Sequence, residues 1–266
     1  MIRASKPAIL AMIIILALIS FLVPFRPLSI LAVILLALIA IWIILEKQKP
    51  GITNRIMKNL GETKILIQDG NLTLTAPTAD VTVTATAQSP FAVIDGTEVA
   101  ISEGIGIERD SKEVKKIELY VPECLKSVSL ALVSGDLDVR DVKCDELHAK
   151  SVSGNVKLTH ITCDSLEAKS VSGDAEIWEH SGKTLDAASI SGDVDAESDA
   201  ASISVSTTSG SILVRYRGES KPSVTVSSVS GSWEVFSRSG IGQFTETGTE
   251  GSITAKSISG EIRIKG

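Results

Sequence analysis

The sequence is poor in aromatic residues and in cysteine. Phe, Trp and Tyr together make up 4% of the 266 residues, and there are three cysteines. A hydrophobic core must therefore be assembled mainly from Val, Ile, Leu and Ala. This composition suits a narrow, repetitive interior better than a large irregular one, because the side chains that bury most area are scarce.

Positive charge is scarce over most of the chain. Residues 1–60 contain seven Lys or Arg and one acid, whereas residues 61–266 contain 19 basic and 31 acidic residues, for a net charge of −12. Binding to nucleic acid calls for clustered Lys and Arg that neutralise phosphates. The acidic part of the chain therefore excludes nucleic acid as a partner.

Two long apolar runs lie near the N-terminus. Residues 7–25 and 27–45 are each 19 residues long and contain no charge. A helix of that length spans about 28 Å, close to the thickness of a bilayer's hydrocarbon core. A signal peptide is the alternative, but the first run is long for one and the second run follows at once. Residues 1–50 are therefore predicted to form a transmembrane helical hairpin in the lipid bilayer, and residues 51–62 a linker.

Basic residues flank the hairpin on both sides. Arg3 and Lys6 precede it, four further Lys or Arg lie between residues 47 and 58, and only Arg26 lies between the two runs. Basic residues are retained on the cytoplasmic side. The pattern predicts a multi-pass protein of the cell membrane whose C-terminal part is cytoplasmic, and the alternative is a C-terminal part that faces outward.

The acidic part of the chain repeats with a period of about 19 residues. A Ser-Gly pair recurs, and the steps between its glycines are 19, 19, 19, 18, 21 and 29 residues. The positions seven, five and two residues before each glycine, and two and four after it, are apolar with one exception, Thr208. These glycines are predicted to be structural turn residues: Gly135, Gly154, Gly173, Gly192, Gly210, Gly231 and Gly260.

The spacing within a repeat indicates short strands on either side of a turn. Apolar residues alternate with period two before and after each glycine, as strands with one buried face require, and glycine permits a sharp turn. Stacked repeats would bury each column of apolar residues. The fold class predicted is an all-β solenoid, with an antiparallel sandwich as the alternative. The column two residues before glycine is predicted to point inward: Val133, Val152, Val171, Ile190, Thr208, Val229 and Ile258.

The two ends of the repeat region differ from its middle. Residues 63–121 alternate apolar and polar residues without the period and are predicted to be capping strands, followed by solenoid repeats over 122–266. Residues 236–248 form an insertion that is predicted to bulge as a loop. Ile262 and Ile264 are predicted to complete the last repeat and to leave an unpaired edge, which would allow end-to-end self-association.

The repeat resembles a known family. The segments SVSGNV at 151–156, SVSGDA at 170–175 and SISGDV at 189–194, together with the stretch 117–139, look like the putative adhesin family of prokaryotic β-solenoid domains. The resemblance implies the fold and supplies no catalytic residues. It also implies a location outside the membrane, which conflicts with the charge pattern.

Several polar columns are candidates for chemistry. Asp136, Asn155, Asp174 and Asp193 follow successive glycines and suggest either a Ca²⁺ ladder or turn residues bonded to nearby backbone N–H groups; the second interpretation is favoured because no calcium-solenoid motif is present. Two carboxylates 5–10 Å apart would be needed to cleave a polysaccharide, but Asp174 and Asp193 lie at repeated turns without distinctive neighbours. No catalytic residue, metal site or cofactor is therefore predicted.

Cys144 and Cys163 share one column, with Cys124 one residue out of it. A disulfide or a metal site is conceivable, but the spacing of 20 and 19 residues fits no local ligand motif. Free thiols stacked by the repeat are the favoured interpretation. His148, His160 and His180 occupy different columns and are predicted to be exposed.

The function that these features favour is a membrane-anchored, non-enzymatic scaffold or binding module, with a protein or polymer bound along the solenoid flank. One alternative is an adhesin-like domain at the cell surface. A second is a self-assembling, cytoskeleton-like scaffold at the membrane.

Overall fold

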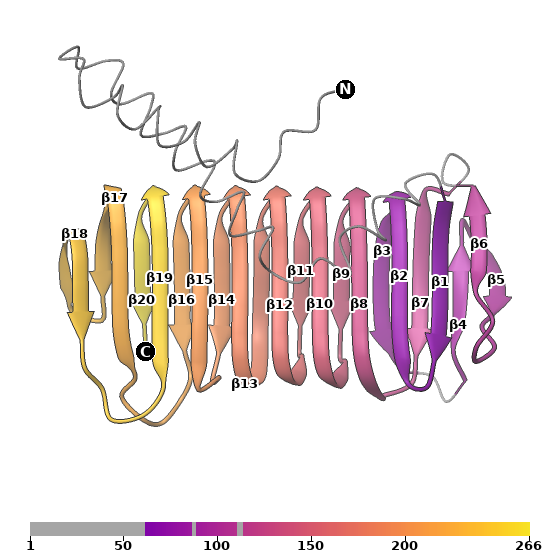
Figure 1. The fold of residues 1–266 in the computed structure, drawn as a ribbon, viewed down its shortest axis with the longest axis horizontal. Helices are drawn as coiled ribbons and strands as arrows, with labels where there is room; N and C mark the ends of the chain where they lie inside the picture. The colour runs from indigo at the N-terminus through magenta and orange to yellow at the C-terminus, as the bar shows by residue number, and fades with distance from the viewer. Residues whose placement is uncertain (1–61, 87–88, 111–113) are drawn as a thin grey trace, which may run out of the picture. The chain divides into compact units, whose positions relative to one another are not determined.

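The computed structural model describes residues 62–86, 89–110 and 114–266, all within the unit Asn59–Gly266. Every regular element in these ranges is a β-strand (Figure 1). Among them there is no helix of the length and hydropathy needed to cross a bilayer. The predicted hairpin, with its spans 7–25 and 27–45, lies outside the described residues. So does the predicted linker 51–62, except for Glu62, which is the first residue of a strand.

The strands follow one another closely along the chain. Their bounds are β1 (Glu62–Gln68), β2 (Asn71–Thr78), β3 (Asp80–Ala85), β4 (Phe91–Ile94), β5 (Thr97–Ala100), β6 (Ile107–Asp110), β7 (Lys116–Val121), β8 (Cys124–Ser134), β9 (Leu137–Arg140), β10 (Lys143–Ser153), β11 (Val156–Thr159), β12 (Thr162–Ser172), β13 (Ala175–Ser191), β14 (Val194–Ser198), β15 (Ser202–Ser209), β16 (Ile212–Tyr216), β17 (Ser223–Val235), β18 (Arg238–Glu246), β19 (Ser252–Ser259) and β20 (Ile262–Lys265).

Each repeat contributes one strand to each of two parallel stacks, and we call one repeat a rung. The first stack runs β2, β8, β10, β12, the second half of β13, β15, β19 and the first half of β17. The second runs β3, β9, β11, the first half of β13, β14, β16, β20 and the end of β17. The all-β solenoid predicted from the period is therefore confirmed for the described residues.

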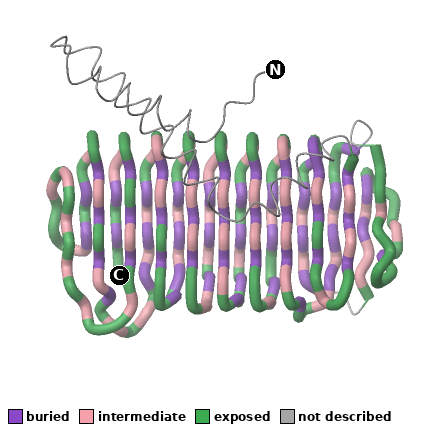
Figure 2. Tube along the Cα trace, in the orientation of Figure 1, coloured by how far each residue is buried: buried purple, intermediate pink, exposed green. Residues whose placement is uncertain are grey.

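Equivalent residues of successive repeats lie side by side. Leu147 pairs with Leu166 and Ala149 with Ala168, so each column predicted seven and five residues before glycine is a real column. These residues are at most 1% exposed. Figure 2 shows buried positions recurring at the same heights from rung to rung. The core is a narrow row of aliphatic side chains, as the shortage of aromatic residues requires.

The predicted inward column two residues before glycine is wrong. Val171 is 42% exposed, and Val152 and Ile190 are exposed to a similar degree. The residue before each of them is buried instead, and Ser170 is 4% exposed. The reason is that the alternation seven and five residues before glycine continues unbroken to the third residue before it, and the bend begins only afterwards.

The turn glycines are packed backbone against backbone. A Cβ added to Gly173 would lie 2.3 Å from the carbonyl oxygen of Gly154, and one added to Gly154 would lie 2.1 Å from that of Gly135. Gly173 also has φ near +152°, a conformation unfavourable for residues with a side chain. The structure thus gives the turn glycines a role beyond bending the chain, because they let neighbouring rungs approach closely.

The order of the last two rungs in space differs from their order in sequence. β19 pairs with β15 on one side and with β17 on the other, so the final repeat is inserted between two earlier ones. Ile262 lies between Ile212 and Trp233. The predicted free edge at Ile262 and Ile264 is therefore wrong: both residues are fully buried.

The insertion predicted as a loop is largely a strand. β18 pairs antiparallel with β17 along most of its length and covers the terminal rung (Figure 1). Trp233 of β17 packs against Phe244 of β18, with ring centroids 4.5 Å apart and the ring planes tilted by 33°. Gly240 leaves room for the indole. The solenoid therefore ends in a capped rung.

The N-terminal region predicted as capping strands contains a complete rung. Leu72 pairs with Val128 and Val81 with Leu137, and Ala79 takes the place of the turn glycine beneath Gly135. The capping itself is done by β1 with β6 on the first stack and by β7, β4 and β5 on the second. The rung was missed because a long insertion between β3 and β8 breaks the period.

Candidate functional site

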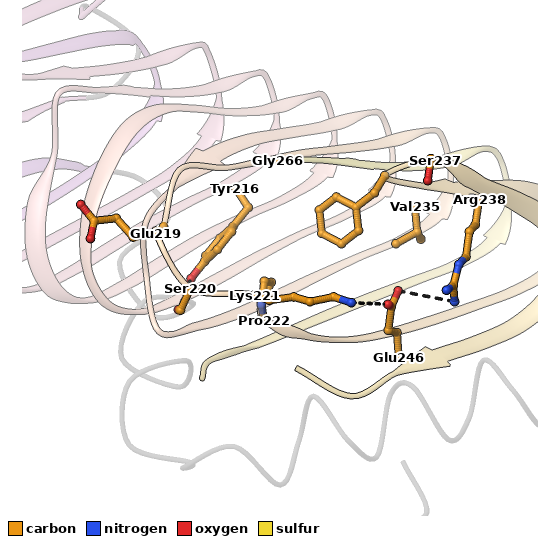
Figure 3. A pocket seen from close by; sticks show the side chains of 12 residues that line it. Tyr216, Glu219, Ser220, Lys221, Pro222, Val235, Ser237, Arg238, Glu246 and Gly266 are labelled. Carbon is orange, nitrogen blue, oxygen red and sulfur yellow. Dashed lines mark hydrogen bonds and ion pairs between the residues drawn. The ribbon is translucent and has the colours of Figure 1, made fainter. Parts of the chain in front are cut away.

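The loop after Tyr216 and the insertion 236–248 together form a pocket of about 450 Å³ at the capped end of the solenoid (Figure 3). Its lining comes from the end of β16, the loop that follows, the turn between β17 and β18, and the end of β18. The lining residues include Tyr216, Lys221, Phe236, Arg238 and Glu246. They are distant in sequence and meet because β18 folds back along β17.

A shared carboxylate organises the charged side of this pocket. Lys221 Nζ lies 2.6 Å from Glu246 Oε1, and Arg238 lies 3.8 Å from Glu246 Oε2. Figure 3 shows the two cations reaching the carboxylate from different sides. Lys221, by its hydrogen bond, and then Arg238, by its charge, hold the pKa of Glu246 below its ordinary value. The carboxylate therefore stays ionised and keeps both basic side chains in place.

Aromatic side chains provide the apolar part of the pocket. Tyr216 is 8% exposed, and its hydroxyl lies 3.5 Å from Ser220 Oγ. Phe236 has φ of 51°, which is rare for a residue with a bulky side chain. Such strain persists only where the surrounding structure imposes it. Here the tight turn into β18 imposes it and brings Phe236 into the lining.

The repeat pattern of the sequence does not predict this pocket. Its residues belong to no repeated column, so the alignment of repeats passed over them. The available signal was the 29-residue step that contains residues 236–248, since insertions in repeat proteins tend to gather on the binding face. Predicting the pocket itself would have required the pairing of β17 with β18.

A second pocket, of about 480 Å³, lies along the turns between the two stacks. His160 Nδ1 is 3.3 Å from Asp141 Oδ1, and His160 Nε2 is 2.8 Å from Glu179 Oε2. All three residues have positive φ, so they occupy equivalent turn positions in successive rungs. Acidic and basic side chains alternate around this open pocket, and Arg217 adds a further positive charge.

The three histidines differ in exposure. His160 is exposed, as predicted, and His148 is half-buried against Glu167, with His148 Nδ1 2.9 Å from Glu167 Oε2. His180 is fully buried, contrary to the prediction. His180 stands in the column of Val142 and Ile161, which are buried, and pairs in register with buried Ser198. The column, and not the polarity of the side chain, was the signal for its burial.

The Asp and Asn residues that follow the turn glycines accept hydrogen bonds from backbone N–H groups of the next rung. The N–H of Asn155 donates to Asp136 Oδ1 at 2.8 Å, and that of Asp174 donates to Asn155 Oδ1 at 2.9 Å. The N–H of Asp193 donates to Asp174 Oδ1 at 2.8 Å. These contacts agree with the interpretation as a capped turn.

The structure also confirms that Cys144 and Cys163 are direct neighbours, and it pairs Cys124 with Lys143.

Comparisons with known proteins place the chain in a family. Among solved structures, a putative adhesin from Bacteroides fragilis has 15% identity and a TM-score of 0.45, covering 76% of this chain and 95% of that one. A putative cell adhesion protein from Clostridium sporogenes has 12% identity and a TM-score of 0.29, covering 77% and 98%. No curated protein sequence matches. Residues 54–265 match the Toastrack DUF4097 family, and the chain therefore belongs to that family.

Proposed function

We propose that this protein is a non-catalytic binding module held at a membrane by its N-terminal segment, with its ligand site in the pocket at residues 216–246. The observation that carries the proposal is the place of this pocket. It lies where an insertion breaks the repeat, and it combines an aromatic lining with a fixed cluster of charges. Insertions of this kind supply binding surfaces on otherwise regular scaffolds.

The ligand that suits this lining is a saccharide. Sugars present an apolar ring face that packs on aromatic side chains, and hydroxyl groups that bond to charged or amide groups. Phe236 and Tyr216 offer the first kind of contact, and Lys221, Arg238 and Glu246 offer the second. Ligand pockets typically combine an apolar wall with a few placed polar groups in this way.

Titration calorimetry on the full chain in detergent tests the ligand class, after a glycan array has selected a saccharide. Phe236→Asn removes the ring but tolerates the positive φ, and Arg238→Ala removes one of the cations. Each is expected to weaken binding at least tenfold. Arg263→Ala is the matched control, since Arg263 pairs with Glu261 and Glu234 outside the pocket. Equal affinity in Arg238→Ala and Arg263→Ala would contradict the assignment of the site.

The anchor follows from the apolar runs 7–25 and 27–45, and the flanking charges favour a cytoplasmic solenoid. Ser191 is exposed at a turn, so Ser191→Cys, with the three native cysteines replaced by Ser, reports the side of the membrane. A membrane-impermeant thiol reagent is expected to label it only after the cells are opened. Labelling in intact cells would instead establish an outward-facing, adhesin-like module. A chain that remains in the soluble fraction would contradict the anchor.

A further inference from the structure

Cys144 and Cys163 face each other on neighbouring parallel strands. They are in-register partners of β10 and β12, and adjacent strands are separated by about 4.8 Å. That separation falls within the Cα range of disulfides, about 4.4–6.8 Å. Cys163 is 2% exposed, whereas Cys144 is partly exposed. One thiol of the pair is therefore open to small molecules, and the other is protected.

The rung beyond Cys163 is adapted to hold a histidine. The in-register partner of Cys163 in that rung is Gly182. A Cβ there would lie 1.8 Å from the carbonyl oxygen of Cys163 and 3.1 Å from His180 Nε2. The absence of a side chain leaves room for the His180 ring beside the thiol. His180 Nε2 lies 3.6 Å from Cys163 Sγ.

A second contact orients the same ring. His180 Nδ1 lies 2.8 Å from Ser198 Oγ, which also accepts a hydrogen bond from the N–H of Ala200 at 3.0 Å. With Nδ1 at Ser198, Nε2 is the nitrogen that faces the Cys163 thiol, and the ring also has a hydrogen bond with the backbone of Cys163. Burial lowers the pKa of His180, so the ring is neutral at neutral pH and can act as a base.

The two thiols differ electrostatically in the same sense as they differ in exposure. A hydrogen bond from the Cys163 thiol lowers the pKa of Cys144. The interaction with Cys144 and burial raise the pKa of Cys163. The thiolate, which is the reactive form, is therefore favoured at the more accessible sulfur.

We propose that Cys144 and Cys163 are a redox-active pair that a hydroperoxide converts to a reversible disulfide. The Cys144 thiol first gives up its proton to water. The thiolate attacks one peroxide oxygen, the O–O bond breaks, and the other oxygen leaves as an alkoxide or hydroxide, which takes up a proton from water to become an alcohol or water. Cys144 is thereby oxidised to a sulfenic acid. The Cys163 thiol then passes its proton to His180 Nε2 and attacks the Cys144 sulfur. The expelled hydroxide takes that proton and leaves as water. In total, two thiols lose two electrons and one hydroperoxide is reduced.

The full chain in detergent, with Cys124 replaced by Ser, is treated with one equivalent of hydrogen peroxide and followed by intact mass and thiol counting. The expected product has lost two hydrogens and both free thiols, and dithiothreitol restores them. The reference rate is measured separately on the wild-type chain, which retains Cys124. This residue is exposed and has no cysteine partner in register, so its oxidation rate is that of an ordinary thiol. A Cys144 that reacts no faster than Cys124, or a pair that accumulates sulfinic acid without a disulfide, would overturn the proposal.

Variants assign the two roles. Cys163→Ser is expected to trap the sulfenic acid on Cys144, where dimedone labels it, and Cys144→Ser to abolish the fast reaction. His180→Gln is expected to slow disulfide formation at least tenfold while leaving the formation of sulfenic acid unchanged. Equal slowing of both steps would show that His180 acts only through packing. The result for the intact pair stands without any variant, so misfolding of one of them cannot hide a negative outcome.

Discussion

Three residues before four of the turn glycines stands a buried Ser or Thr that donates a hydrogen bond to a turn carbonyl of the neighbouring rung: Ser170, Ser189, Thr207 and Ser257. The buried hydroxyls of Ser151 and Ser228, in the same column, have no hydrogen-bond partner among the described residues. Ser170 Oγ donates to the carbonyl of Gly154 at 3.1 Å, and Ser189 Oγ donates to that of Gly173 at 2.9 Å. The side chain is small enough for the narrow end of the core, and its hydroxyl satisfies a carbonyl at the bend. Unpaired buried polar groups cost stability, so this pairing explains why a polar residue is tolerated inside.

Introducing a carboxylate at one or the other of two neighbouring positions, Ser170 and Val171, tests this arrangement. Ser170→Asp places a carboxylate in the core and is expected to lower the free energy of unfolding by at least about 2 kcal/mol. Val171→Asp places it at an exposed position and is expected to change stability by less than about 1 kcal/mol. Urea denaturation of the two variants measures both. A larger loss of stability for Val171→Asp than for Ser170→Asp would show that Val171 and not Ser170 is buried.

The pair of His148 and Glu167 makes stability depend on pH. The hydrogen bond that His148 donates to the Glu167 carboxylate raises the pKa of His148 above its ordinary value. A raised pKa in the folded state gives stability that is complete below the unfolded pKa, near 6.5, and is lost as pH rises through the folded pKa. Because His148 is partly exposed, the effect is expected to stay below about 1 kcal/mol. Wild type should lose this increment above pH 6.5 relative to His148→Gln, and parallel pH profiles of the two would exclude it.

At the scale of the element, the unit that repeats is a strand, a bend and a second strand, and the bend sets the distance between rungs. Glycine at the bend allows each carbonyl to approach the next rung along the stack. The Asp or Asn that follows caps the N–H of the next turn. The bend is thus bonded from rung to rung by side chains as well as by the backbone.

Gly173→Ala is expected to destabilise the protein by about 3 kcal/mol or more, because the new Cβ would lie 2.3 Å from a carbonyl oxygen and φ is unfavourable. Gly96→Ala is the control: Gly96 also has positive φ, but no heavy atom lies within 4 Å of its added Cβ. Its cost is expected to be the backbone strain alone, about 1 kcal/mol. Thermal unfolding of both variants separates the two contributions. Equal shifts would mean that contact between rungs contributes nothing.

At the scale of the molecule, the described solenoid is closed at both ends by strands that depart from the repeat. At the C-terminal end, β18 covers β17 and is held by the contact between Trp233 and Phe244. A regular uncovered rung would offer unpaired N–H and C=O groups to another chain. We therefore expect self-association only where β18 is displaced from β17.

Phe244→Ser is expected to loosen β18 and to promote concentration-dependent association of the full chain. Ile241→Ser on the same strand is the control, because Ile241 is 82% exposed and contributes little to holding the strand. Sedimentation velocity in detergent distinguishes the two variants. If Phe244→Ser remains as dispersed as Ile241→Ser, β18 has no role in preventing association.

Much of the solenoid could be predicted because the apolar residues and the turn glycines recur at nearly constant spacing in the sequence. Residues such as Leu147 and Leu166 are 19 positions apart and are in register in the structure. Stacking of identical rungs leaves few other ways to bury such columns. Alternation with period two likewise identified most inward positions, since successive side chains of a strand point to opposite faces.

The places where prediction failed depend on contacts that the repeat does not specify. The predicted burial of Ser170 and Val171 was reversed, because the bend begins one residue later than their hydrophobicity suggests. The pocket around Phe236 and Glu246 required knowledge of how an insertion folds.

The sequence by itself determined the repeat, the aliphatic core and the stacking of equivalent residues. Only the tertiary structure decided that β19 and β20 lie between β15–β16 and β17, and with that order the cap and the pocket. The physical reason is that every rung presents nearly the same apolar columns, so many rung orders would bury similar surfaces. The choice among them falls to the antiparallel pairing of β18 with β17, which returns the chain to the gap before the terminal rung.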